Sequence, residues 1–296
     1  MITLPKVYIL NKLFKIKMDW KTLQENSDDI LAQGILKLKN QESKNWDSIS
    51  SQNYGNYLIC ENEINWYIGE GKNISKRLKQ QFNEKLSTFY KTYKKDFGNN
   101  KIESFKVKYI ETKIGRKEIE EFGIVNLPTS LNKFQKNKCK KFELENNSKF
   151  NWDSIQNSFE TLLIDGEKTF FQQNSKNWVE AIAPNNAGVY MVFNNNKIIY
   201  IGETSSLIER YNTHSGTTYF SALRRHIGKT LLKFNFVQIK VKNKKNREFL
   251  EKDDLEVTNF LKSCTVKFLP INFGRFELEE FLIRKHHPIL NKKDNK

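Results

Sequence analysis

The sequence predicts an α+β fold made of two tandem copies of one unit. Each copy is expected to be a small antiparallel β-sheet flanked by helices, with a helical preface on its N-terminal side. Two observations lead to this prediction: short motifs occur twice in the same order, and in both copies two β-rich runs are followed by helix-forming segments. A chain of 296 residues is also long enough for two ordinary domains. We place the first domain at residues 1–137 and the second at residues 138–296.

Five short motifs recur: a tryptophan, Ser-Lys-Asn-Trp, Gly-x-Tyr, Tyr-Ile-Gly-Glu and Gly-Arg-x-Glu-x-Glu-Glu-Phe. They occur at Trp20, 43–46, 55–57, 67–70 and 115–122, and again at Trp152, 175–178, 188–190, 200–203 and 274–281. The first four are repeated after 132 or 133 residues and the last after 159. The difference of 26 (159 − 133) indicates an insertion in the second copy, between Arg210 and Val266. Chance does not easily produce so many ordered matches, so the chain is a tandem duplication.

Each copy begins with a polar preface that is expected to be helical and to end near the Ser-Lys-Asn-Trp motif. Two β-rich runs then flank a polar tip and predict a hairpin in each copy, because asparagine suits a tight turn. Gly69 or Gly202 ends the second run, and a helix follows with Ser75 or Ser206 near its start as a cap. The hairpin runs are 57–60 with 66–68 and 189–193 with 198–201, the third strands 105–109 and 265–268, and the final helices carry 119–122 and 278–284.

Residues 132–151 are interpreted as the linker into the second preface. The insertion is expected to contain an extra strand at 234–241 and a charged helix at 247–261.

The charge balance indicates a polyanionic partner. Lys plus Arg number 50 and Asp plus Glu 34, which gives a formal net charge of +16. Such an excess favours nucleic acid. A lysine-rich, solvated surface is the alternative explanation. The segment 224–226 (Arg-Arg-His), preceded by Tyr219 and Phe220, is interpreted as a DNA-backbone contact, with an ordinary solvated helix as the alternative.

The cysteines and the hydropathy indicate a soluble, cytoplasmic protein. Cys60, Cys139 and Cys264 are odd in number and far apart, which excludes a disulfide framework and a four-cysteine zinc site. No segment approaches the length of an apolar membrane span or a secretory signal. His286-His287 has no partner at ligand spacing, so we do not assign a metal to it.

Five points of the second copy resemble the GIY-YIG endonuclease superfamily. Gly-Val-Tyr at 188–190 and Tyr-Ile-Gly at 200–202 are followed by Arg210, by Glu279 on a late helix, and by Asn291 twelve residues after that glutamate. The first copy repeats the pattern with Tyr57, Tyr67, Arg77, Glu120 and Asn132. Two copies of a five-point pattern are much more specific than a single three-letter motif.

The resemblance implies hydrolysis of phosphodiester bonds in DNA. Glu279 and Glu120 would each bind Mg²⁺, for which Mn²⁺ is a plausible substitute, because a carboxylate oxygen is the ligand that hard cations prefer. Arg210 would hold the scissile phosphate, and Tyr190 would act as general base for the attacking water or would orient it. A phenol needs a positive neighbourhood to lose its proton at neutral pH. In the second copy the implied catalytic residues are Tyr190, Tyr200, Arg210, His214, Glu279 and Asn291, of which Asn291 is expected to hold the site together rather than react.

The first copy departs from the pattern at one site position. His214 follows Arg210 by four residues, whereas Gln81 occupies the equivalent position after Arg77. Glutamine cannot transfer a proton, so the first site is expected to be slower or to use another cation.

Within the superfamily, the restriction endonucleases are the branch that the chain resembles most. Three scattered cysteines do not supply the zinc domain of the repair nucleases that resolve branched DNA, and only five residues follow Asn291, where homing endonucleases carry a DNA-binding region. Two units in one chain could cut both strands of double-stranded DNA as a monomer. A DNA methyltransferase encoded nearby would be the expected companion.

Two alternatives remain open. One is a strand-specific nicking or repair nuclease in which one site is degenerate, and the other is a catalytically silent DNA-binding module.

Overall fold

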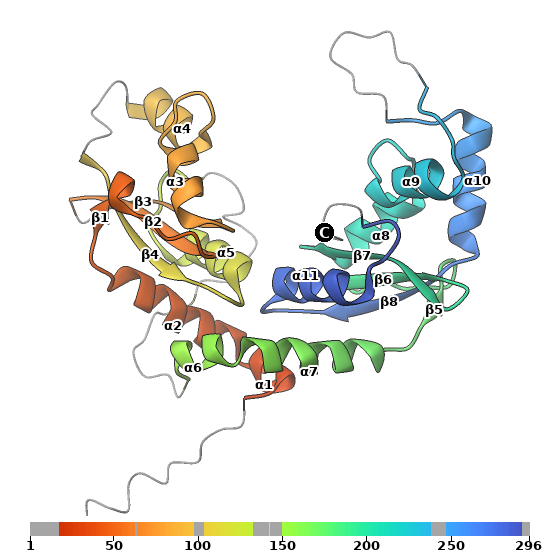
Figure 1. Ribbon diagram of the computed structural model, residues 1–296, viewed down its shortest axis with the longest axis horizontal. Coiled ribbons are helices and arrows are strands. Elements are labelled where there is room, and N and C mark those ends of the chain that lie inside the picture. Colours follow the sequence, from red (N-terminus) through yellow and green to blue (C-terminus); the bar gives the residue numbers. More distant parts are fainter. Residues whose placement is uncertain are drawn as a thin grey trace, which may run out of the picture.

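The computed structural model describes residues 18–62, 64–97, 104–132, 142, 150–237 and 247–291. Two β-sheets lie side by side, and the helices α1, α2, α6 and α7 lie below them in the view of Figure 1. The helices α5 and α11 lie between the sheets. The boundary at 137/138, most of the predicted linker and Cys139 fall outside the described residues. Cys60 and Cys264 are buried thiols. No helix in the described ranges is long and apolar enough to span a membrane.

The first half consists of the following elements in chain order: α1 (Trp20–Glu25), α2 (Ser27–Lys39), β1 (Lys44–Asn45), η2 (Trp46–Ser48), β2 (Gly55–Glu61), β3 (Ile64–Gly71), α3 (Ile74–Gln81), α4 (Thr88–Phe97), β4 (Lys106–Glu111) and α5 (Arg116–Asn126). The second half follows a similar order, with no helix matching η2 among its described residues and with η4 and α10 in addition: α6 (Trp152–Asn157), α7 (Phe159–Phe171), β5 (Lys176–Asn177), β6 (Gly188–Asn194), β7 (Lys197–Thr204), α8 (Leu207–Ser215), α9 (Ala222–His226), η4 (Ile227–Leu231), α10 (Glu251–Lys262), β8 (Thr265–Pro270) and α11 (Arg275–His286).

The two sheets have the same topology. Their strand orders are β1-β4-β2-β3 and β5-β8-β6-β7, and all pairings are antiparallel. The predicted hairpins are confirmed, and their tips contain Asn62, Asn195 and Asn196 with φ between 46° and 61°. Asparagine tolerates this left-handed conformation better than most residues. The mixed α+β class with two helix-flanked antiparallel sheets is therefore as predicted.

The helix start after each hairpin differs from the prediction in the first half. Ser206 caps α8 by accepting a hydrogen bond from the Glu209 amide, as expected. In the first half Asn73 caps α3 through the Lys76 amide, so the assignment of Ser75 is wrong. Asparagine is at least as good a cap as serine, and position 73 is the true counterpart of 206 (206 − 133).

The region between Arg210 and Val266, which includes the insertion, is mostly helical in its described part. It contains α9 and η4, which follow Ser221 as α4 follows Ser87 in the first half, and α10, which begins at Glu251, four residues later than the charged helix predicted at 247–261. Residues 234–237 form no strand, and residues 238–241 of the predicted strand lie outside the described ranges.

Each half places one tryptophan against a glycine of the other half. A Cβ on Gly166 would lie 2.8 Å from the Trp20 ring, and one on Gly34 would lie 2.8 Å from the Trp152 ring. The short helices α1 and α6 thus pack on the opposite halves, as α1 and α7 show in Figure 1. One hydrophobic core consequently contains residues from both halves.

Two glutamines clamp the loops ahead of α5 and α11. The side-chain oxygen of Gln156 accepts hydrogen bonds from the amides of Lys113 and Ile114, and that of Gln24 accepts from those of Asn272 and Phe273. Because residue 24 corresponds to 156 at the repeat spacing of 132, the contacts are related by a pseudo-two-fold axis.

Buried ion pairs join α5 and α11 across the same axis. Arg275 lies 3.0 Å from Glu118 and 2.6 Å from Glu121 of the first half, and 3.2 Å from Glu203 of its own half. Arg116 mirrors this arrangement, with oxygens of Glu70, Glu280 and Glu277 at 2.8, 3.7 and 4.0 Å respectively. Burial and the neighbouring Glu118 raise the pKa of Glu277, whereas Arg116 opposes the rise.

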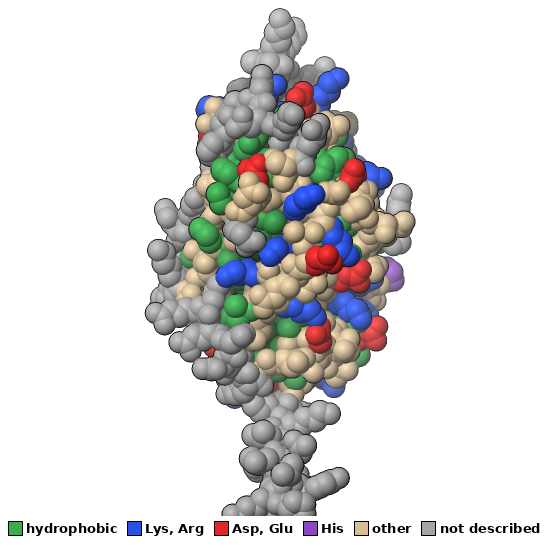
Figure 2. Space-filling model, turned by 90° about the vertical axis from the view of Figure 1, so that its left-hand side faces the viewer, with side chains coloured by type: hydrophobic (Ala, Val, Ile, Leu, Met, Phe, Trp, Pro, Cys, Tyr) green, Lys and Arg blue, Asp and Glu red, His purple; other side chains and the backbone are tan. Residues whose placement is uncertain are grey.

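The outer face of the first half carries charges of both signs. Figure 2 shows Lys and Arg interspersed with Asp and Glu among the described residues of this face. The positive excess of the chain is therefore not gathered into one patch there.

Candidate active site

Two tyrosines lie on neighbouring strands in the second half. The ring centroids of Tyr190 on β6 and Tyr200 on β7 are 6.0 Å apart. Tyr190 is paired with Gly202, and a Cβ at Gly202 would lie only 2.5 Å from the Tyr190 hydroxyl. The glycine of the Tyr-Ile-Gly motif therefore makes room for the phenol to lie across the next strand.

A buried hydrogen-bonded chain begins at Tyr190. Its hydroxyl lies 2.7 Å from His214 Nε2, and His214 Nδ1 lies 2.7 Å from the Ser221 hydroxyl. Burial, reinforced by nearby arginines including Arg210, lowers the pKa of His214 to about 3. The imidazole is therefore neutral at pH 7 and can either accept the Tyr190 proton or donate to the phenol oxygen.

Arg210 and Glu279 act electrostatically on the tyrosine pair. Burial, followed by the second phenol, raises the pKa of Tyr190 well above 10, and Arg210 opposes this rise. Burial, followed by Glu279, raises the pKa of Tyr200. Both phenols are protonated at neutral pH in this state, so a base role requires additional positive charge beside them.

Glu279 and Asn291 are tied to the strand that carries Tyr200. Glu279 Oε1 accepts a hydrogen bond from the Glu203 amide at 3.0 Å. Asn291 donates to the Ile201 carbonyl at 2.7 Å and accepts from the Ile201 amide at 2.9 Å. Because β7 is the last strand in the order of its sheet, these bonds satisfy backbone groups that strand pairing on that side would otherwise leave open. Asn291 is thus placed as a positioning residue.

The first half repeats this arrangement. Tyr57 on β2 pairs with Gly69, where a Cβ would lie 2.3 Å from the phenol oxygen. The Tyr57 and Tyr67 rings are 6.3 Å apart, and Arg77 opposes the upward shift that burial causes in the pKa values of both phenols. Asn132 brackets Ile68 with two hydrogen bonds of 2.9 Å.

The hydrogen-bonded side chains behind Tyr57 differ chemically from those behind Tyr190. Gln81 donates to the Tyr57 hydroxyl at 2.8 Å, and the Ser87 hydroxyl donates to the Gln81 carbonyl at 3.0 Å. The geometry is the same as that of Tyr190, His214 and Ser221, but an amide cannot accept a proton from the phenol.

The carboxylate of the first site has a lysine beside it. Lys117 and Glu120 form an ion pair one helical turn apart, with side chains only 19% and 12% exposed. Burial raises the pKa of Glu120 and Lys117 opposes that shift. Burial lowers the pKa of Lys117, but Glu120, together with Glu121 and Glu70, outweighs it and the pKa is raised. At the equivalent position (276 − 159 = 117) the second half carries the uncharged Phe276.

The donor sets suit a hard cation that keeps most of its water. Within the described ranges no three His, Cys, Asp or Glu side chains gather as a metal cluster, and the candidate carboxylates are those of Glu120 and Glu279. Mg²⁺ commonly binds one or two carboxylates together with substrate phosphates, and Glu279 fits that pattern. His286 Nε2 lies 2.8 Å from Glu167 Oε1, a carboxylate neighbour that was not identified from the sequence.

Several site residues were missed from the sequence. Ser221 supports His214, and the His226 ring lies 6.5 Å from that of Tyr200, with its Nδ1 2.7 Å from the Leu290 carbonyl oxygen. The interpretation of the segment 224–226 as a DNA-backbone contact, which includes His226, is wrong for Arg224. This arginine is fully buried and pairs with Asp254 at 3.0 Å, because α10 packs beside it.

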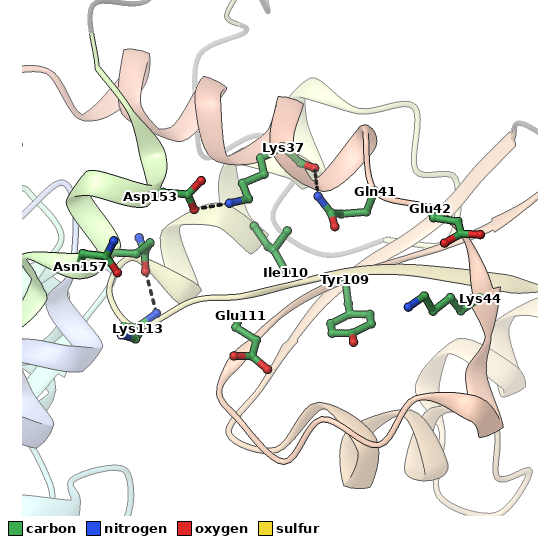
Figure 3. Close-up of a pocket in the computed structure, with 11 residues that line it drawn as sticks. Lys37, Gln41, Glu42, Lys44, Tyr109, Ile110, Glu111, Lys113, Asp153 and Asn157 are labelled. Carbon is green, nitrogen blue, oxygen red and sulfur yellow. Dashed lines mark hydrogen bonds and ion pairs between the residues drawn. The ribbon is translucent and has the colours of Figure 1, made fainter.

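None of the candidate site residues lines the pocket in Figure 3. It has a volume of about 390 Å³ and is lined by residues of α2, β4 and α6 with charges of both signs, such as Lys37, Glu111 and Asp153. Lys37 and Asp153 form an ion pair that joins the halves. Its mixed lining indicates a junction between the halves rather than a phosphate site.

Comparisons with known proteins agree with the geometry of the second half. No curated protein matches the chain at a significant level. The family model of the GIY-YIG catalytic domain matches residues 169–296, a range that contains Tyr190, Arg210, Glu279 and Asn291. This match supports the GIY-YIG superfamily for the second half of the chain and implies nuclease activity on DNA.

Proposed function

We propose that the protein is a Mg²⁺-dependent restriction endonuclease that cuts both strands of double-stranded DNA as a single chain. The observation that carries the proposal is the pseudo-two-fold pairing of α5 with α11. These helices bear Glu120 and Glu279, so one rigid interface holds both candidate sites. Restriction enzymes that act as dimers need the same relation between sites, and here the duplication would supply it.

The first half is then a second GIY-YIG-like domain. It has the same strand order as the second half, the same pairing of a tyrosine with a glycine, and the same asparagine hydrogen-bonded to the edge-strand backbone. The family match covers the second half alone, so the proposal for the first half depends on this internal likeness.

The side chains of the second half suit the hydrolysis of a phosphodiester. Arg210 would bind the scissile phosphate through its planar guanidinium. Tyr190 would orient the attacking water and take up its proton while passing its own phenolic proton to the neutral His214. A Mg²⁺ ion held by Glu279 would neutralise charge on the phosphate and help the leaving oxygen, with Mn²⁺ as a substitute. Arg210 and the bound metal would supply the positive surroundings that the phenol needs.

Plasmid digestion tests the proposal. Supercoiled and phage DNA are incubated with the purified chain in Mg²⁺ or in EDTA. Discrete double-strand fragments that disappear in EDTA are expected, and size analysis on a duplex should show one chain per duplex. Failure to cut either DNA in Mg²⁺ would contradict the nuclease proposal, and two chains per duplex would contradict the monomer. A companion methyltransferase is expected to block cutting by modifying the same site.

A strand-specific nicking enzyme is the second candidate. Gln81 in place of a histidine favours it, because the first site lacks the proton acceptor behind its tyrosine. Nicked circles that never become linear would support this candidate over the first.

A further inference from the structure

The two candidate metal carboxylates have different neighbours. Glu120 is paired with the Lys117 ammonium on the same helix face, and both side chains are largely buried. The equivalent of Lys117 is Phe276, which places an aromatic ring and no charge one turn before Glu279. The remaining backbone framework, including the glycine-opposed tyrosine and the bracketing asparagine, is shared.

We propose that Lys117 is an internal competitor for the divalent cation at Glu120, so that the two sites differ in metal affinity and the second half cuts its strand first. This inference rests on the proposed function and assigns a role to a residue outside the family pattern. An ammonium that already neutralises the carboxylate must move before a cation can take its place.

The competition has a simple electrostatic basis. A like charge within a few ångströms disfavours a bound cation, and the effect is larger at a half-buried position than in open solvent. The Lys117–Glu120 spacing of three residues on α5 keeps the pair on one face of the helix. At the second site, the neutral Glu203 amide donates a hydrogen bond to Glu279 Oε1. This bond orients the carboxylate and leaves its negative charge in place.

Metal binding by the full chain tests the inference without depending on cleavage. Mn²⁺ is titrated into the protein, and free Mn²⁺ is measured by electron paramagnetic resonance. The wild type should bind one Mn²⁺ in a tighter class that Glu279→Gln removes and Glu120→Gln leaves in place. Lys117→Phe should add a second site, with affinity raised by about tenfold or more, and Glu120→Gln in that background should remove it.

The reciprocal substitution and a distant control sharpen the test. Phe276→Lys should weaken the Mn²⁺ site of Glu279, whereas Lys21→Phe, which removes the same charge from an exposed position on α1, should change neither site. Lys117→Met replaces Lys117→Phe if the latter lowers the melting temperature. Equal Mn²⁺ binding through Glu120 and Glu279 in the wild type, or no gain in both Lys117 variants, would overturn the inference.

Cleavage at limiting Mg²⁺ gives a second, independent reading. The wild type should accumulate nicked plasmid before linear product, and Lys117→Phe should shorten the life of that intermediate. If the chain cuts no DNA while the Mn²⁺ pattern holds, the proposed function fails and the unequal metal affinity stands. If DNA is cut but both carboxylates bind Mn²⁺ alike, the proposed function stands and the unequal metal affinity fails.

Discussion

The two halves differ little in the contacts that join them and more in the side chains around their tyrosines. Trp20 with Gly166 mirrors Trp152 with Gly34, and the Arg116 cluster mirrors that of Arg275. Around the tyrosines, by contrast, Gln81 stands where the second half has a histidine, and a lysine pairs with the first glutamate. The relative placement of the sites therefore depends on contacts that both halves supply, whereas the chemistry of each site depends on its own half.

The largest effect is expected from breaking the interface. Arg275→Ala would leave three carboxylates, Glu118, Glu121 and Glu203, without their common cation, and removal of one partner of a buried pair costs about 3–5 kcal/mol. Arg116→Ala should cost less, because only one of its carboxylates lies closer than 3.7 Å. Urea unfolding of the two variants measures the difference, and equal losses would contradict the asymmetry.

The histidine should matter to activity in the second half. His214→Gln installs the side chain of the first half and should slow the cutting of one strand by roughly 10²-fold, the lower range for losing a general acid–base contribution. Gln81→His should speed the cutting of the other strand. Single-turnover assays with each strand labelled separately provide the measurement. A His214→Gln enzyme with unchanged rates would remove the histidine from the mechanism.

The same substitution should change how stability depends on pH. Because the pKa of His214 is lowered in the fold to about 3, the unfolded chain binds this proton more readily than the folded one does. Stability from this group is therefore complete above about pH 6.5 and is lost as the pH falls toward 3, at up to ~1.4 kcal/mol per pH unit. His214→Gln should lose less stability than the wild type between pH 7 and 5 in thermal melts. An identical pH slope for the two proteins would contradict the buried, neutral histidine.

The smallest effects are expected at the glycines that receive the tryptophans. Gly34→Ala would place a Cβ 2.4 Å from Ile119 and 2.8 Å from Trp152, whereas the three atoms nearest to a Cβ at Gly166 all belong to Trp20, at 2.8 to 3.0 Å. Overpacking costs about 1–3 kcal/mol, partly offset by alanine's better helix propensity. Gly34→Ala should therefore be the more destabilising in urea titrations. The opposite ranking would show that the first half relaxes more easily at this contact.

The sequence predicted the elements whose signals are local. Hairpins, third strands and final helices follow from patterns within each half, and the implied site residues come together around both tyrosine pairs. The Ser75 cap was wrong although the repeat spacing already places the counterpart of Ser206 at Asn73.

The contacts between the halves could not be predicted in the same way. Trp20 was recognised as part of the repeat, but its partner Gly166 is 146 residues away (166 − 20) and no local pattern connects them. The buried ion pair of Lys117 with Glu120 was missed because a lysine three residues before a glutamate is ordinary on an exposed helix face. Only burial of the pair beside the tyrosines gives it significance.

The central claim is that one chain presents two candidate sites of unequal strength across a pseudo-two-fold axis. The most direct test is strand-resolved cleavage by Glu279→Gln and Glu120→Gln, each compared with the wild type. Each variant should lose the cutting of one strand, a different one in each case. The loss should be roughly 10²–10³-fold, as when one electrostatic contact to a transition state is removed, and the strand that Glu279 serves should be cut first in the wild type. Unchanged products from Glu120→Gln would contradict the account by leaving the first half without a catalytic site.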